Sequence, residues 1–158
     1  MEELDRILGK SGRIMTKDVV VTIAGFQTLD DDDNAVEMVH IGEYYEKNGT
    51  HYIFFEERMD GMSEPVKNRM KIKEGYLGVQ KRGPVSVDMV FETGKSQSST
   101  YAIPFGSFLI ETHTKKVKVT ETKDRMEVTA EYEMEINGVY CAKSEIKVMI
   151  EEKERFRL

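Results

Sequence analysis

The strongest constraint in the sequence is a strict alternation of apolar and polar side chains near the C-terminus. From residue 126 to residue 136, every second residue is apolar, and the residues between are glutamate or threonine. Successive side chains of an extended strand point to opposite faces, so this run predicts a β-strand with one face in a core and the other in water. We expect the apolar members to be buried and the glutamates exposed, the apolar set being Met126, Val128, Ala130, Tyr132, Met134 and Ile136.

Short turn signals divide the rest of the chain into similar segments. Asn48-Gly49 and Asn137-Gly138 each lie between two such segments, and this dipeptide favours the type I′ hairpin turn because both of its central residues take positive φ. Pro104-Phe105-Gly106 marks a further break, since proline removes a ladder donor. We predict about ten strands, over residues 17–26, 36–47, 50–58, 66–73, 76–82, 85–92, 98–103, 107–121, 126–136 and 139–151.

A long meander of this kind predicts a closed sheet. Strands joined by short turns form consecutive antiparallel hairpins, and closure removes the exposed edges that would otherwise promote aggregation. We therefore expect an all-β fold, a single antiparallel meander closed into a lipocalin-like β-barrel of about 8–10 strands. Residues 1–14 form a separate extension, in which Leu4, Ile7 and Leu8 favour a short helix; residues 15–158 form the barrel domain.

Composition excludes several classes of protein. A net charge of −6 argues against nucleic-acid binding, which requires clustered lysine and arginine. No apolar run reaches the roughly 20 residues of a membrane helix, so no membrane association is expected. Cys141 is the only cysteine, which rules out an internal disulfide and is consistent with a reducing compartment. We expect a cytoplasmic protein.

The middle of the chain resembles a known family. The matching segments are residues 42–49, 52–57, 81–83, 89–94 and, most specifically, the Tyr-Ala-Ile-Pro-Phe-Gly element at 101–106. These are similar to segments of the YwiB-like family, small bacterial proteins of unknown function with lipocalin-like (calycin-type) barrels. Ile103 stands where the family element has threonine, which weakens a polar role there. The resemblance implies a barrel and brings no known activity or catalytic residue.

Catalytic and metal-binding patterns are weak in this sequence. No nucleophile elbow, phosphate loop or dinucleotide fingerprint occurs, so we predict no catalytic residues and no cofactor. The acidic run at 30–33 lacks the glycine and glutamate of an EF-hand loop. Glu111 and His113 share one strand face, but the sequence names neither a third metal ligand nor a supporting partner, and no metal site is predicted.

The aromatic residues suggest a ligand-binding lumen. Tyrosine offers an apolar face with a polar tip, and a guanidinium at the barrel mouth can hold an anion. The predicted ligand-binding residues for a small apolar or mixed apolar/anionic ligand are Tyr45, Tyr52, Phe54, Arg82, Phe91, Tyr101 and Tyr132. The alternative is a non-catalytic interaction barrel with a filled lumen, which forms a homodimer through a hairpin or strand edge. An enzyme is the third hypothesis.

Overall fold

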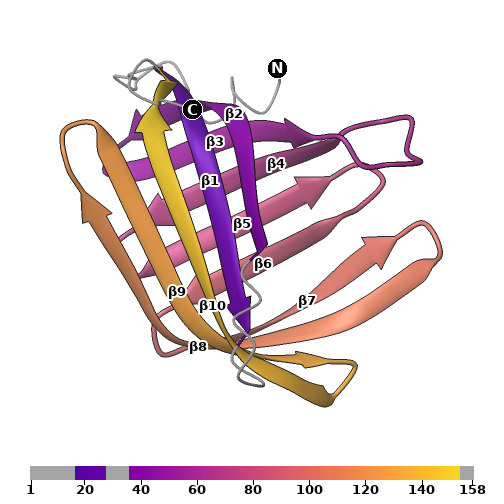
Figure 1. Cartoon of the computed structure of the whole chain (residues 1–158). Coiled ribbons are helices and arrows are strands. Elements are labelled where there is room, and N and C mark those ends of the chain that lie inside the picture. Colours follow the sequence, from indigo (N-terminus) through magenta and orange to yellow (C-terminus); the bar gives the residue numbers. More distant parts are fainter. Residues whose placement is uncertain (1–16, 28–35, 154–158) are drawn as a thin grey trace.

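The structure, a computed structural model, describes residues 17–27 and 36–153. It contains ten antiparallel strands in one sheet that curls into a nearly closed barrel (Figure 1). The strands are β1 (Lys17–Gln27), β2 (Val36–Lys47), β3 (Thr50–Glu57), β4 (Val66–Lys73), β5 (Tyr76–Arg82), β6 (Val87–Glu92), β7 (Ser96–Ile103), β8 (Gly106–Glu121), β9 (Arg125–Ile136) and β10 (Val139–Glu152). The expected N-terminal helix and the acidic run at 30–33 lie outside the described residues. Within them, no helix is long and apolar enough to cross a membrane.

The sheet order shows how the barrel closes. The order is β6-β5-β4-β3-β2-β1-β10-β9-β8-β7, so the first and last strands of the chain are neighbours. The two ends of the sheet meet at one bridge, where Ser86 and Ala102 exchange backbone hydrogen bonds of 2.9 and 2.8 Å. Farther along the same seam, the Thr112 hydroxyl donates to the Val90 carbonyl at 3.3 Å. These few contacts join β6 to β7 and β8 without a continuous ladder, which leaves the barrel nearly closed.

A sharp bend in β2 divides the sheet into two crossing layers. Residues 36–44 of β2 pair with β1, whereas only residues 43–47 pair with β3. Gly42 lies at the change of partner, and a Cβ atom there would lie 2.7 Å from the Phe54 carbonyl oxygen. Only glycine permits this approach of two backbones. In Figure 1, the direction of β3 to β6 accordingly crosses the direction of β1, β9 and β10.

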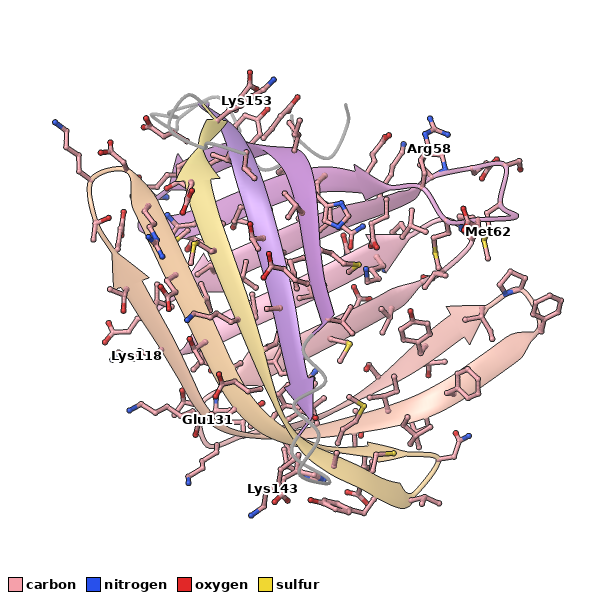
Figure 2. All side chains as sticks on the ribbon, viewed as in Figure 1. Arg58, Met62, Lys118, Glu131, Lys143 and Lys153 are labelled. Atoms are coloured by element: carbon pink, nitrogen blue, oxygen red, sulfur yellow. The ribbon has the colours of Figure 1, made fainter. Side chains whose placement is uncertain are left out.

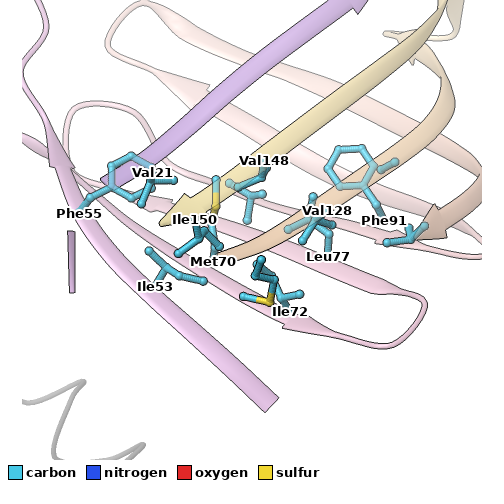
Figure 3. Close-up of a cluster of buried hydrophobic side chains, with 14 of the residues drawn as sticks. Val21, Ile53, Phe55, Met70, Ile72, Leu77, Phe91, Val128, Val148 and Ile150 are labelled. Carbon is cyan, nitrogen blue, oxygen red and sulfur yellow. The ribbon is translucent and has the colours of Figure 1, made fainter. Parts of the chain in front are cut away.

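The core lies between the two layers, toward the end of the barrel where β8 turns into β9. Figure 3 shows this cluster of buried apolar side chains. Its members come from both layers, and those with almost no solvent exposure include Val21, Ile53, Met70, Ile72, Leu77, Phe91, Val128 and Val148. We call this the closed end, and the opposite end, where the β7–β8 and β9–β10 hairpins diverge, the open end.

The register predicted for residues 126–136 is confirmed, but the predicted burial is met only in part. Met126, Val128 and Ala130 are buried in the core, and Glu131 is exposed, whereas Glu127, Glu133 and Glu135 are partly buried on the outer face. Tyr132 and the two apolar residues after it share the core face but are only partly buried. They are less buried because β9 runs from the closed end toward the open end, where fewer side chains cover the inner face.

The predicted turns are also confirmed. Asn48 and Gly49 have φ of 51° and 79°, and Asn137 and Gly138 have φ of 49° and 81°. Positive φ at both central residues is the type I′ geometry. Pro104 and Phe105 form the turn between β7 and β8, where Ile103 pairs with Gly106.

We predict that Gly49→Val and Gly138→Val each lower the free energy of unfolding by about 1–3 kcal/mol, because a β-branched residue is strained at positive φ. Gly25→Val is the matched control. Gly25 is not among the residues with positive φ, and its Cβ would meet no atom within 4 Å. Urea unfolding measures all three variants. Equal stability of the Gly25 and Gly138 variants would contradict the assigned turn.

Candidate functional site

Four polar side chains from consecutive strands face inward near the open end. They are His40 of β2, Glu57 of β3, Asn68 of β4 and Lys81 of β5. Their pairing partners establish their direction: His40 pairs with the core residue Val21, and Lys81 pairs with Asn68. Because side chains alternate along each strand, all four lie on the core-facing side of the sheet. We call this set the inner-wall polar cluster.

Three members of the inner-wall polar cluster form a closed hydrogen-bond network. The Lys81 ammonium donates to Glu57 Oε1 and, at 2.8 Å, to Asn68 Oδ1. The Asn68 amide in turn donates to the same Glu57 oxygen at 2.8 Å and to the Val66 carbonyl at 3.2 Å. The side chains of Glu57 and Lys81 are only 15% and 22% exposed, so this ion pair is largely shielded from solvent.

Burial and charge act in opposite directions on these groups. Burial by itself would raise the pKa of Glu57, but the hydrogen bond and charge of Lys81, together with Asn68, outweigh it and hold that pKa below its ordinary value. Burial lowers the pKa of His40, and the Lys81 charge adds to this, whereas Glu57 opposes it. At neutral pH the cluster therefore contains one carboxylate, one ammonium and a neutral imidazole.

The Nε2 atom of the His40 ring is buried on the inner wall. The ring stacks on Phe55 with centroids 4.6 Å apart, and among the described residues its buried Nε2 atom has no hydrogen-bond partner. An unsatisfied buried polar atom costs about 1–3 kcal/mol. Such an atom on an inner wall indicates a position where a ligand group or a water molecule completes the bonding.

Tyr101 approaches the inner-wall polar cluster from the other end of the sheet. It lies on β7, opposite Phe108 of β8. Burial raises the pKa of its hydroxyl, and the Glu57 carboxylate raises it further. Its neighbour Ala102 bridges Ser86, and the residue after Ser86, Val87, pairs with Lys81. Tyr101 and Lys81 therefore lie in the same part of the barrel, although β5 and β7 are not neighbours in the sheet.

Several inward-facing apolar side chains toward the open end remain in contact with solvent. Met38 and Phe108 face inward yet are 41% and 39% exposed. Three further inward residues are partly buried, namely Met89, Met134 and Ile146, and of these Met89 and Ile146 pack against the core. The inner wall of the open end thus combines accessible apolar surface with a polar cluster.

The structure places three of the predicted ligand-binding residues on the core-facing side. Phe91 is fully buried in the core, and Tyr132 packs against it with ring centroids 4.7 Å apart. Tyr101 lies at the open end, as described. Of these three, only Tyr101 lies close to the inner-wall polar cluster.

The expectation that Tyr45, Tyr52 and Phe54 line the lumen is wrong. Tyr45 pairs with Tyr52, and both lie on the face opposite to Ile53, which is in the core. The Tyr45 hydroxyl donates to Glu43 on that outer face, at 2.5 Å. Both faces of β2 and β3 are rich in aromatic residues, so the period-two pattern alone could not identify the inner one.

Arg82 is likewise on the outer face, not at the lumen. Its guanidinium binds both oxygens of Asp88 at 3.1 and 2.9 Å, and its side chain is 47% exposed. The basic group that faces inward is its neighbour Lys81. The prediction identified the correct strand end but the wrong face, because one residue along a strand reverses the direction of the side chain.

The three histidines occupy different environments. His51 is buried at the closed end, where its Nδ1 atom hydrogen-bonds the Tyr44 hydroxyl at 2.6 Å. His40 belongs to the inner-wall polar cluster. His113 lies on the outer face, beside a concavity of about 660 Å³ that crosses β8, β9 and β10. Figure 2 shows Glu131 and Lys143, which line this concavity, projecting from the outer face.

We predict that Lys81→Met lowers the free energy of unfolding at pH 7 by about 1.5–3 kcal/mol, because it leaves the Glu57 carboxylate without its charged partner. Arg82→Met is the matched control and changes it by less than about 1 kcal/mol, since its ion pair is exposed. The pKa of Glu57 is lower in the folded state than in the unfolded state. Its ion pair with Lys81 therefore stabilises the fold at pH values above the unfolded-state pKa, and this stabilisation is lost as the pH falls through the folded-state pKa. In urea unfolding, the difference in free energy of unfolding between the wild type and Lys81→Met should therefore become smaller below about pH 4. A deficit that does not change with pH would contradict the assigned pair.

Comparison with known proteins agrees with this architecture. Residues 21–148 match the family model described as domain of unknown function DUF1934. The chain is 27% identical over 124 residues to the uncharacterized beta-barrel protein YwiB of Bacillus subtilis (strain 168), covering 77% of this chain and 86% of that protein. The crystal structure of the ywiB protein from Bacillus subtilis superposes with a TM-score of 0.75 at 23% identity, over 87% of this chain and 92% of the other. On the extent of the family match, the chain belongs to the DUF1934 family of β-barrel proteins.

Proposed function

We propose that the open end of this barrel binds a small amphiphilic molecule. Its polar group contacts the inner-wall polar cluster and Tyr101, and its apolar part lies against Met38, Phe108 and their neighbours. The observation that carries this proposal is the buried Nε2 atom of His40, which has no hydrogen-bond partner in the described part of the chain and lies within a polar cluster on the inner wall. Lipocalin-like barrels of about this strand number can enclose one small ligand.

The cost of the polar cluster supports a binding role. Buried ion pairs are often less stabilising than apolar residues of similar volume, because each ion loses its hydration. An inner wall that served only to pack the barrel would therefore be expected to be mostly apolar, as it is at the closed end, where His51 is bonded to the Tyr44 hydroxyl. Polar groups at the open end are more readily explained by a ligand that they orient.

The protonation states narrow the chemistry of the ligand. Glu57 and Lys81 cancel each other, and His40 is neutral at pH 7, so the cluster has almost no net charge. Lys81 uses two of its three N–H donors within the cluster. The third donor and the His40 ring nitrogen together suit a carboxylate, a hydroxyl or an amide on an otherwise apolar molecule.

Thermal shift with medium-chain fatty acids, the matching alcohols and short carboxylates tests this proposal. A ligand at about a hundred times its dissociation constant adds about 2.7 kcal/mol of stability, which is a rise of several degrees in the thermal midpoint for a chain of this size. We expect amphiphiles to raise the midpoint and short carboxylates to leave it unchanged. A midpoint that no compound raises would count against the proposal.

Two variants assign the binding to the inner wall. His40→Phe keeps the stack on Phe55 but removes the ring nitrogens, and Tyr101→Phe removes only a hydroxyl. Each should weaken binding about tenfold, because each removes a hydrogen bond worth roughly 1–1.5 kcal/mol. Arg82→Ala, on the outer face next to Lys81, should bind like the wild type. Equal affinity of all three variants would place any observed binding elsewhere.

A second candidate function is homodimerisation through the edge of β2. Residues 36–42 pair with β1 and not with β3, so within residues 17–27 and 36–153 one side of this segment has no ladder partner. Val39 and Ile41 on its outer face are 48% and 64% exposed. An unpaired edge next to apolar side chains favours strand addition from a second copy. Light scattering should then show a dimer that Ile41→Lys dissociates; a monomer at all concentrations contradicts this candidate.

A further inference from the structure

Strands β8 and β9 bring two glutamates and a histidine together on the outer face. Glu111 and His113 are two residues apart on β8, so they share a face, and Glu135 of β9 pairs directly with Glu111. One ligand atom from each residue lies within 4.8 Å of the other two. His113 Nε2 is 2.5 Å from Glu135 Oε2 and 3.9 Å from Glu111 Oε2.

Ser96 of β7 supports the histidine from the opposite side. Ser96 pairs with His113, and its Oγ atom is 2.7 Å from His113 Nδ1. This hydrogen bond orients the imidazole so that Nε2 is the nitrogen that faces both glutamates. Histidines that bind metals are usually held in this way, with the second ring nitrogen hydrogen-bonded to a protein group.

The arrangement of charge is unfavourable without a cation. Glu111 and Glu135 are directly opposite on antiparallel strands, where like charges destabilise the pair. A third carboxylate, Glu133, pairs with His113 on the same face. A divalent cation between Glu111 and Glu135 would convert this repulsion into attraction, whereas one imidazole can offset it only when protonated.

We propose that Glu111, His113 and Glu135 bind a divalent transition-metal ion, with zinc as the best fit. An imidazole nitrogen with two carboxylate oxygens suits zinc, whereas calcium and magnesium prefer oxygen ligands alone. Ligands about 2.1 Å from a tetrahedral ion lie roughly 3.4 Å apart. The Glu135 oxygen must therefore move away from His113 by roughly 1 Å and the Glu111 oxygen must approach by roughly half that, which side-chain rotation permits at half-exposed positions.

Three protein ligands leave the fourth position of a tetrahedral ion for water. His113 also lines the outer-face concavity, together with Glu133 and Lys143, so solvent can reach the ion. This outer-face site is separate from the inner wall, and it does not depend on the proposed ligand in the barrel. The sequence alone showed Glu111 and His113; folding adds Glu135 as the third ligand and Ser96 as the supporting partner.

Isothermal titration of the full chain with Zn²⁺, after dialysis against a chelator, tests the proposed site. We expect one ion per chain and weaker binding at acidic pH, because the imidazole must lose its proton to bind. Glu135→Gln and His113→Gln should each reduce affinity by at least about tenfold, as expected for loss of a ligand. Absence of saturable binding would overturn the proposal.

Glu133→Gln is the matched control for the metal site. It removes one negative charge from the same strand and face, two residues from Glu135, but it lies outside the cluster. We expect its affinity for Zn²⁺ to stay close to that of the wild type. Equal losses in Glu133→Gln and Glu135→Gln would show only diffuse attraction to an acidic surface and would overturn the assignment.

The visible absorption of bound Co²⁺ provides a second measurement, since Co²⁺ reports the coordination directly. We expect tetrahedral absorption bands in the wild type and in Glu133→Gln. The bands should be lost in His113→Gln while its thermal midpoint without metal stays near that of the wild type. Retained bands in His113→Gln would exclude this histidine as a ligand.

Discussion

The bend of β2 at Gly42 is the constraint on which the rest of the molecule depends. It lets the chain pair with β1 on one side and β3 on the other while the two layers cross. A side chain at this position would collide with the Phe54 carbonyl, so the crossing requires glycine. The bend brings the apolar inner faces of both layers together, and burial of those faces is the main stabilising term in folding.

This crossing makes the two ends of the barrel chemically different. At the closed end both layers contribute apolar side chains, and residues such as Ile72 and Val148 lose all contact with solvent. At the open end the β7–β8 and β9–β10 hairpins diverge, and inward residues such as Met38 stay exposed. Stability therefore comes mainly from one end, which leaves the other able to accept the polar inner-wall cluster that the proposed function uses.

Both proposed sites depend on which face of a strand a residue occupies. Lys81 faces the interior and neutralises Glu57, whereas Arg82, one residue later, forms an exposed pair with Asp88. On the opposite layer, Tyr132 lies against the core, whereas Glu135 faces outward toward His113. The same sheet thus presents two independent sets of polar groups, one inside and one outside.

The sequence by itself determined the strands, their turns and the barrel, because period-two alternation and Asn-Gly turns are local signals that survive folding. It also identified the inner face of β9, where only one face is apolar. It could not orient β2 and β3, whose faces are both aromatic, and the pattern therefore predicts the wrong face for Tyr45, Tyr52 and Phe54. Only the tertiary structure decided which polar groups meet, such as Glu57 with Lys81, because cross-strand register and the crossing of the layers bring together residues that are distant in sequence.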